Sequence, residues 1–424
     1  MNPRDFLAAS GLVLVAKFAG AFSEFSLQVV LARTLGVHEF GVFTFTFTAV
    51  TVAASLAALG LDTASVRLVS EYHAARRWSE LKGMWVRLPA ISLSVAVPFA
   101  LVLCSAGAWL AVDDEVSAGL IWALVLLPAL TLNRIKQGVL RGLRAVLYYE
   151  TTDNILRPVA LIAVAVTGAV MYPQYWSPHA ALAAYSALTI LVILLGLFRI
   201  NSRKPQDWRS IAPAFNTSYW LKISFPMLII SWMQLVQTQA DIIMLGLLRD
   251  TSSAGVYGAV ARISTVLTFG LLAVNLVFAP MIAVYASEQR MAELQSMART
   301  AARVSVLFTV PVAVVVAAFS EVLLGLFGPG FQAGKPALLL LLFGQLASGL
   351  CGSVGTIMTM SGQQSAAAWI FSACAVINVI LNLLLIPGNG MVGAAFATAA
   401  TMAILNLWLL VAVRRSTGIY AGLH

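Results

Sequence analysis

The sequence predicts an all-α, polytopic membrane protein with about 12 transmembrane helices in two pseudo-symmetric six-helix bundles around a central cavity. The first observation is composition: the 424 residues are 60% hydrophobic and 10% charged, with a mean hydropathy of +0.90. A water-soluble domain could not carry so much apolar surface. The second observation is that the apolar stretches are continuous. Strands of a membrane β-barrel would alternate instead, so the sequence favours helices.

An internal repeat is the third observation. The segment LQVVLARTLGVHEFGVF (27–43) aligns with DIIMLGLLRDTSSAGVY (241–257), at an offset of 241 − 27 = 214 residues. A period of this size marks a duplication of half the chain. Parallel halves around a cavity at the membrane midplane are the usual architecture of secondary transporters. The repeat therefore indicates transport.

Each half contains six apolar stretches that are long enough to span ~30 Å of hydrocarbon, which takes roughly 20 helical residues. The predicted spans are 6–31, 40–69, 84–112, 117–143, 146–171 and 179–199 in the first half, and 219–248, 254–285, 301–327, 334–361, 364–386 and 391–413 in the second. The most polar stretch lies between the halves. We therefore expect an N-terminal lobe over 1–200, a cytoplasmic linker over 201–218 and a C-terminal lobe over 219–424.

The distribution of lysine and arginine predicts the orientation in the membrane. With the N-terminus in the cytoplasm, most cationic loop residues fall on the cytoplasmic side, where they are favoured. These are Arg76, Arg77, Lys82, Arg141, Arg144, Arg203, Lys204, Arg209, Arg290, Arg299, Arg414 and Arg415. Both termini are expected to be cytoplasmic. The net charge of +9 fits this bias and anionic membrane lipids, so it does not indicate nucleic-acid binding.

Enzyme chemistry finds no support in the sequence. The cysteines Cys104, Cys351 and Cys374 lie in apolar spans and share no metal-ligand spacing with the four histidines. No nucleotide-binding P-loop is present. We therefore expect no catalytic residues, no metal site and no bound cofactor.

Four basic residues stand far from the ends of their predicted helices. Lys17, Arg134 and Arg157 are each expected ~15 to 20 Å from the cytoplasmic face at ~1.5 Å per residue. Arg262 approaches the midplane from the other side. A charge that faces lipid at such depth costs several kcal/mol, so each should face a partner or a wet cavity.

Acidic partners for these cations are few. Lys17 and Glu24 share a helical face seven residues apart, and Asp153 precedes Arg157 by four residues, so ordinary ion pairs within one helix remain an open alternative. Arg134 and Arg262 have no acid nearby in sequence. The expected surplus of positive charge favours an anionic cargo.

Other polar residues in the spans have weaker assignments. Gln28, Gln237 and Asn275 offer hydrogen bonds to a hydroxyl-rich cargo, although hydrogen bonding between helices is the commoner use of such residues. Glu24 and Asp62 are candidates for binding a coupling proton or sodium ion. Asp241 is expected to be a packing residue near a helix end.

The sequence also resembles a known family. The segments ARTLGVHEFGVF, DIIMLGLLRDTSSAGVYGAVARIS, GLFGPGFQAGKPALLLLLFGQL and LNLLLIPGNGMVGAAFAT resemble the polysaccharide transporter branch, with its Wzx-type flippases, of the multidrug/oligosaccharidyl-lipid/polysaccharide (MOP) exporter superfamily. The resemblance covers nearly the whole chain. It implies two six-helix bundles around a cavity and the flipping of undecaprenyl-pyrophosphate-linked oligosaccharide, an O-antigen or exopolysaccharide repeat unit, from the cytoplasmic to the periplasmic leaflet of a bacterial inner membrane.

Together these observations lead to one hypothesis. Lys17, Arg134, Arg157 and Arg262 bind the pyrophosphate of a lipid-linked oligosaccharide, and the lobes then alternate access. Membrane potential, or a proton or sodium ion gradient, supplies the driving force, and a glycan polymerase complex is a possible partner. The alternatives are a cation-coupled multidrug or metabolite exporter of the same superfamily, a lipid II flippase, or a membrane glycosyltransferase. Lipid II flippases usually carry two further C-terminal helices, whereas this chain ends soon after Arg415.

Overall fold

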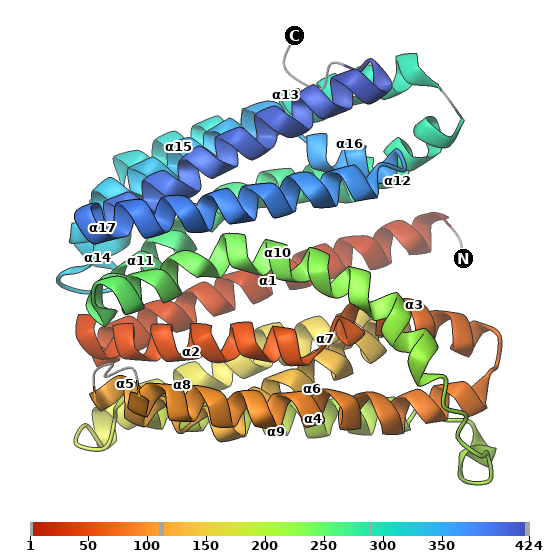
Figure 1. The fold of residues 1–424 in the computed structure, drawn as a ribbon, viewed down its shortest axis with the longest axis horizontal. Coiled ribbons are helices and arrows are strands. Elements are labelled where there is room, and N and C mark those ends of the chain that lie inside the picture. Colours follow the sequence, from red (N-terminus) through yellow and green to blue (C-terminus); the bar gives the residue numbers. More distant parts are fainter. Residues whose placement is uncertain (1–2, 110–113, 289, 420–424) are drawn as a thin grey trace. The chain divides into compact units, whose positions relative to one another are not determined.

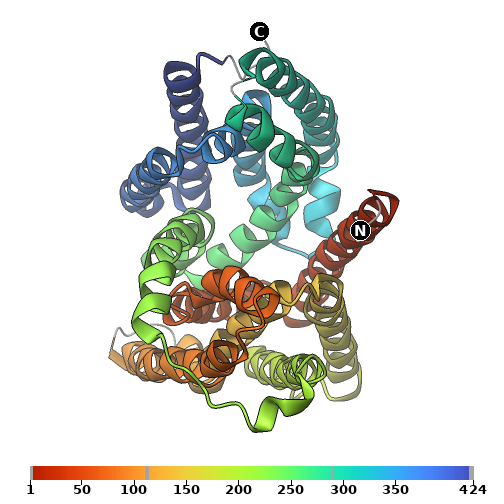
Figure 2. The same ribbon diagram turned by 90° about the vertical axis from the view of Figure 1, so that its right-hand side faces the viewer.

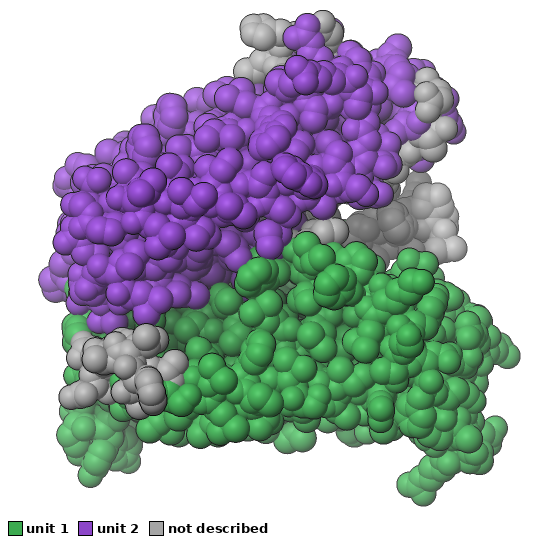
Figure 3. Space-filling view, viewed as in Figure 1, with its two compact units in different colours: residues 1–232 green, residues 233–424 purple. Residues whose placement is uncertain are grey.

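The computed structural model describes residues 3–109, 114–288 and 290–419, and every regular element in these ranges is helical. The chain divides into two compact units, Met1–Trp232 and Met233–His424 (Figure 3). The predicted all-α class is confirmed. The predicted end of the third span, at residue 112, lies outside the described residues.

Unit 1 is a helical bundle centred on α6, which packs against α2, α3, α4 and α9 (Figure 1). Its core includes the buried side chains of Leu68, Met84 and Val139. Its elements are α1 (Pro3–Leu35), α2 (Val37–Ala57), α3 (Leu61–Ala74), α4 (Trp78–Trp109), α5 (Asp114–Leu120), α6 (Ala123–Gly142), α7 (Val146–Tyr149), the π-helix η1 (Glu150–Leu156), α8 (Arg157–Met171), α9 (Pro178–Asn201), the 3-10 helix η2 (Gln206–Arg209) and the first half of α10 (Thr217–Leu248).

Unit 2 is a second helical bundle, seen from another side in Figure 2. Its core includes the buried Ile282, Leu294 and Cys374. Its elements are the second half of α10, α11 (Thr251–Ser264), the 3-10 helix η3 (Thr265–Leu267), α12 (Thr268–Ser287), α13 (Met291–Ala318), α14 (Ser320–Gly325), the 3-10 helix η4 (Phe331–Gly334), α15 (Lys335–Cys351), α16 (Val354–Met360) and α17 (Gln364–Thr417).

The sequence repeat recurs in the helix boundaries. Helix α2 begins at Val37 and α11 begins at Thr251, and 251 − 37 gives the same offset of 214 residues. The two starts are capped differently: Gly36 precedes α2 with a positive φ of 82°, whereas the Asp250 side chain accepts a hydrogen bond from the Ser253 amide at the start of α11. The helix therefore starts at the same place in both halves, although the residues that cap the two starts differ.

The span predicted over 40–69 is broken in the structure. Leu59 and Gly60 adopt positive φ values of 53° and 71°, which end α2 and start α3 in a new direction. A side chain at position 60 would overlap the backbone of α10 at Ser224 and Leu228. Glycine is thus required both by the backbone angle and by the close approach of α10.

The linker predicted over 201–218 is packed onto α4 within unit 1. The Lys82 ammonium donates hydrogen bonds to the backbone oxygens of Trp208 (3.0 Å) and Ile211 (2.7 Å), and the rings of Trp85 and Trp208 lie 4.6 Å apart. Burial lowers the pKa of the Lys204 ammonium below its usual value, and repulsion from Lys82 lowers it further, by a smaller amount. The two compact units divide later, between Trp232 and Met233 inside α10.

Ten helices of the described chain are long and apolar enough to cross a membrane. One of them, α17, covers both of the last two predicted spans and is bent at Gly390, where φ is 53° and ψ is −131°. The ten do not include α6, which carries Arg134, Lys136 and Arg141. The chain is therefore a multi-pass membrane protein, and the count of twelve spans stays a prediction.

Candidate functional site

Lys17 of α1 pairs with an acid from another helix. Its Nζ lies 3.5 Å from Oε1 of Glu150 in η1; the Lys17 side chain is 40% exposed, whereas that of Glu150 is 4% exposed. Glu150 also accepts a 2.7 Å hydrogen bond from Asn154. The pairing of Lys17 with Glu24 that the sequence left open is not the one the structure forms. The 3.5 Å separation is long for a charge-assisted hydrogen bond, so this ion pair is loose.

Arg134 also has an acidic neighbour, which its sequence surroundings did not indicate. Its Nη1 lies 3.6 Å from Oδ2 of Asp62, so α6 and α3 are joined by a second loose ion pair. The other oxygen of Asp62 accepts a hydrogen bond from the Thr63 amide in the first turn of α3. The acid comes from another helix and not from the local sequence, because α3 approaches α6 closely enough for contact at Gly138.

A buried ion pair in unit 1 joins Lys136 of α6 to Asp153 of η1. Their side chains are 2% and 0% exposed, and Lys136 Nζ lies 2.9 Å from Oδ2 of Asp153. Asn133 (2.9 Å) and Gln137 (3.0 Å) donate hydrogen bonds to Oδ1 of Asp153, and Thr152 (3.1 Å) donates one to Oδ2. Residues 133, 136 and 137 share one face of α6, because positions three and four apart are neighbours on a helix.

Sequence analysis overlooked Lys136. The available signal was its polar spacing: Asn133, Lys136 and Gln137 form an i, i+3, i+4 set inside an apolar helix. Asp153 was considered only as a partner of Arg157 in the same helix. The structure turns it to α6 instead.

Arg157 is the basic residue of this group that has no acid in direct contact. Its Cζ lies 4.8 Å from the ring centroid of Tyr185 in α9. Its Nε is buried and has no hydrogen-bond partner among the described residues. Glu24 and Asp153 act on the guanidinium electrostatically, without an ion pair to either in the described part of the chain. The planar guanidinium of Arg157, which has five N–H donors, is thus held by its contact with the Tyr185 ring.

The four deep basic groups of unit 1 are matched by acidic groups among the described residues, so this cluster carries no surplus of positive charge. Four basic side chains of this region face an equal number of acidic ones. They are Lys17, Arg134, Lys136 and Arg157 against Glu24, Asp62, Glu150 and Asp153. The expectation failed because the partners come from other helices, at sequence separations that a search for i, i+4 pairs does not cover. These cations differ in how closely a carboxylate oxygen approaches each of them.

In unit 2, the sequence assigned Arg262 to cargo binding. The structure places it in the last turn of α11 with an exposed side chain. Its cargo role stays a prediction.

A buried carboxylate is the main polar feature of unit 2. Asp241 of α10 is 3% exposed. Its Oδ2 accepts hydrogen bonds from Tyr257 of α11 and from Thr398 of α17 (2.6 Å), and its Oδ1 accepts one from Asn382 of α17 (2.7 Å). Within the described residues no basic side chain forms an ion pair with it. The neutral donors hold this carboxylate in place without compensating its charge.

Two further contacts close the Asp241 network. Asn382 donates to the side-chain oxygen of Asn378 (3.1 Å), and Asn378 donates to Thr398 (3.0 Å). The side-chain oxygen of Asn382 is buried without a hydrogen-bond partner in the described structure. Carboxylate, amide and hydroxyl oxygens are the ligands that hard cations prefer. The cluster suits a proton or a small cation.

Asp241 was predicted to be a packing residue, and its hydrogen bonds between helices do not exclude that role. The repeat carries a further signal, because the corresponding residue of the first copy is Leu27, at 241 − 27 = 214. Because the matching position of the first half is apolar, the fold that the two halves share does not require an acid at position 241.

The predicted glycan-contact residues have mixed environments. Gln28 is buried. Gln237 donates a 2.9 Å hydrogen bond to the backbone oxygen of Phe371, so it joins α10 to α17. Asn275 is partly buried and its side-chain oxygen has no hydrogen-bond partner among the described residues. Gln237 thus forms a hydrogen bond between two helices in this structure.

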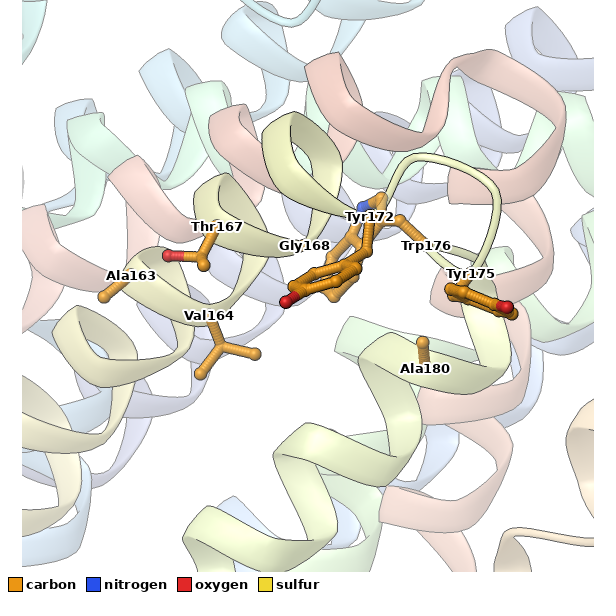
Figure 4. A pocket seen from close by; sticks show the side chains of 8 residues that line it. All are labelled: Ala163, Val164, Thr167, Gly168, Tyr172, Tyr175, Trp176 and Ala180. Carbon is orange, nitrogen blue, oxygen red and sulfur yellow. The ribbon is translucent and has the colours of Figure 1, made fainter.

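A separate apolar hollow of about 530 Å³ lies between the end of α8 and the start of α9 (Figure 4). Tyr172, Tyr175 and Trp176 form its aromatic side, and Val164 and Ala180 contribute to its walls. A side chain at Gly168 would come within 2.6 Å of the Trp176 ring, so glycine lets the indole lie on α8. The side chains that line it are apolar or carry neutral hydroxyl and indole groups, and none of them is charged.

Comparisons with known families and proteins agree with the membrane fold. The profile of the family described as "Polysaccharide biosynthesis protein" matches residues 7–286, and that of the MatE family matches residues 223–384. A probable low-salt glycan biosynthesis flippase of Haloferax volcanii is 24% identical over 409 residues, which cover 94% of this chain and 82% of that protein.

Solved structures share the fold at low sequence identity. An inward-facing multidrug resistance MATE transporter of the MOP superfamily superposes with a TM-score of 0.79 at 13% identity, covering 96% of this chain and 98% of that one. The lipid II flippase MurJ, in an inward closed conformation, gives a TM-score of 0.71 at 15% identity, covering 95% of this chain and 87% of that one.

Proposed function

This chain belongs to the polysaccharide biosynthesis protein family, and we propose that it flips a lipid-linked oligosaccharide across the membrane. The cargo is a polyprenyl-pyrophosphate-linked glycan, moved from the cytoplasmic to the opposite leaflet by alternating access of the two units. A carrier of this kind shelters the charged, hydroxyl-rich head while the lipid tail stays in hydrocarbon. The similarity to a probable glycan flippase supports this class of cargo.

Arg157 is the observation that carries the proposal. A guanidinium stacked on Tyr185, with a buried Nε that lacks a hydrogen-bond partner in the described chain, has donors to spare. Phosphate oxygens match the planar fork of arginine in bidentate geometry. An anion bound at Arg157 would supply the hydrogen bonds that the protein leaves unmade.

Lys17 and Arg134 support the same capture step. Their acidic partners lie 3.5 and 3.6 Å away, beyond the 2.7–2.9 Å of a strong charge-assisted bond. A pyrophosphate with two or more negative charges competes well for cations held so loosely. Arg262 remains a proposed contributor from unit 2.

Ion coupling is proposed as the second element of the mechanism, with Asp241 as its site. The sequence pointed to Glu24 and Asp62, but Asp62 lies near Arg134, whereas Asp241 has neutral donors and no ion pair in the described chain. Binding and release of a proton or sodium ion there would bias the packing of α10, α11 and α17. Export of negative cargo across an inside-negative membrane is also favoured by about 2.3 kcal/mol per charge per 100 mV.

The Asp241 cluster also favours one alternative function, a cation-coupled multidrug or metabolite exporter. Such a protein would use a buried carboxylate as its dominant site and would carry cationic cargo. The two proposals differ in the charge of the cargo. The proposed setting is a bacterial inner membrane with both termini in the cytoplasm, and a glycan polymerase complex is a proposed partner.

A flipping assay tests the function. The purified chain is reconstituted into liposomes with a fluorescent polyprenyl-pyrophosphate oligosaccharide, and the label that a membrane-impermeant reductant can reach is measured over time. Protein-dependent flipping of this anionic lipid, with no transport of a cationic dye under the same gradients, is the expected result. Transport of the dye and not of the glycolipid would overturn the proposal in favour of the exporter.

A further inference from the structure

We propose that Lys136 is a positioning residue for anion binding at Arg157. By holding Asp153, it keeps this carboxylate from pairing with Arg157 and leaves the guanidinium available for phosphate. The inference rests on the proposed function, because it concerns the same anion-binding group. Lys136 itself would touch no cargo.

The Asp153 side chain points away from Arg157 and toward α6. Asp153 precedes Arg157 by four residues, and in a regular α-helix this spacing would place the two groups side by side as an ion pair. Here the residues from Glu150 to Leu156 form a π-helix, whose wider turn changes that register. The carboxylate faces α6, where Asn133, Lys136 and Gln137 donate to it.

Lys136 is held in place from three sides. It contacts both oxygens of Asp153, at 3.0 and 2.9 Å, and donates to the backbone oxygen of Val192 in α9 at 3.3 Å. Its stem lies against Gly196, where any side chain would overlap it. Lys136 therefore joins α6, η1 and α9 at one point.

The balance of charge around Arg157 also depends on Lys136. Asp153 remains close enough to act on Arg157 electrostatically, as does Glu24. Without the Lys136 ammonium, the buried carboxylate would keep only amide and hydroxyl donors, while the Arg157 guanidinium would still act on it electrostatically. A buried acid without a counter-ion is strongly unfavourable, so Asp153 would recruit Arg157.

The experiment measures the affinity of the full chain, in lipid nanodiscs, for farnesyl pyrophosphate as a probe of the anion site. Four variants are compared with the wild type: Lys136→Met, Asp153→Asn, the double variant and Arg157→Gln. Lys335→Met serves as a matched control, because it breaks the exposed Lys335–Glu321 pair of unit 2. Each variant is first checked for monodispersity and thermal stability.

The expected pattern is asymmetric. Lys136→Met should weaken binding about tenfold or more, the scale of one charged hydrogen bond. Asp153→Asn and the double variant should bind within about threefold of the wild type, since the competing carboxylate is gone. If Lys136→Met and Asp153→Asn weaken binding equally, the Lys136–Asp153 pair is merely structural and the inference fails. If Asp153→Asn alone does not fold, the double variant is compared with Lys136→Met in its place.

The Arg157→Gln variant separates this inference from the proposed function. Loss of binding in Arg157→Gln with normal binding in Lys136→Met overturns only the role of Lys136. Normal binding in Arg157→Gln overturns the anion site itself.

Discussion

The guanidinium of Arg157 lies 4.8 Å from the ring centroid of Tyr185, and ring stacking is its direct contact in the described structure. The other three basic groups of this region lie 2.9 to 3.6 Å from a carboxylate oxygen. The difference singles out Arg157, because the donors of an unpaired guanidinium remain available to an incoming anion.

Arg157→Gln should lower the rate of glycolipid flipping at limiting cargo by about 10- to 100-fold, the scale of one or two charged hydrogen bonds. Arg157→Lys should recover part of the rate, because it keeps the charge and loses the bidentate fork. The measurement is the liposome flipping assay described above.

Arg199→Gln is the matched control for Arg157. Arg199 also stacks on a tyrosine, Tyr148, at 5.7 Å, but it lies in the last turn of α9. Its loss should leave flipping within about twofold of the wild type. Equal losses in the two variants would show that stacked arginines support the fold and not the cargo.

Asp241→Asn should remove the response of flipping to an imposed ion gradient. Asparagine has nearly the same shape and keeps one acceptor oxygen for the Asn382 amide, yet it cannot bind a proton or neutralise a cation. Flipping is measured with a sodium gradient, with a proton gradient and with neither.

The control for this prediction is Asp250→Asn, which removes an exposed carboxylate from the start of α11 and keeps a side chain able to cap Ser253. It should respond to gradients as the wild type does. A gradient response that survives in Asp241→Asn would rule out Asp241 as the coupling site.

Gly138→Ala should destabilise the chain by about 1–3 kcal/mol, because the added methyl would overlap the backbone of Asp62 and force α3 away from α6. Thermal unfolding in detergent measures the effect. Gly11→Ala in α1, where nothing lies within 4 Å of the added methyl, should be neutral or slightly stabilising. Similar unfolding midpoints for the two variants would contradict the close packing of α3 on α6.

Lys82→Met should release the linker from α4, because the three backbone oxygens that Lys82 contacts, those of Trp208, Arg209 and Ile211, lose their donor. Trypsin cleavage after Arg203 or Arg209 should become faster. Lys222→Met, which removes an exposed lysine of α10, is the control. Unchanged cleavage in Lys82→Met would show that the tryptophan contacts hold the linker without it.

The fold class could be predicted because it depends on local properties of the chain. Apolar stretches of membrane length and a 214-residue repeat require no knowledge of which helices touch. The same local reasoning missed the break at Leu59 and Gly60, because the break is fixed jointly by a left-handed turn and by α10 from a distant part of the sequence.

The candidate site was only partly predictable. Lys17, Arg134 and Arg157 were identified as charges that need a partner, but every partner named from sequence spacing was wrong or incomplete. Glu150 and Asp62 come from other helices, and the π-helix redirects Asp153 to Lys136. Helical spacing rules describe neighbours within one helix and say nothing about neighbours across the bundle.

The sequence by itself determined that this protein crosses a membrane as two related halves with charged groups buried inside them, because hydropathy and repeats are properties of the chain alone. Only the tertiary structure decided which charges neutralise one another and which remain available. Electrostatic energy depends on distances of a few ångströms, and those distances are set where helices far apart in sequence pack together.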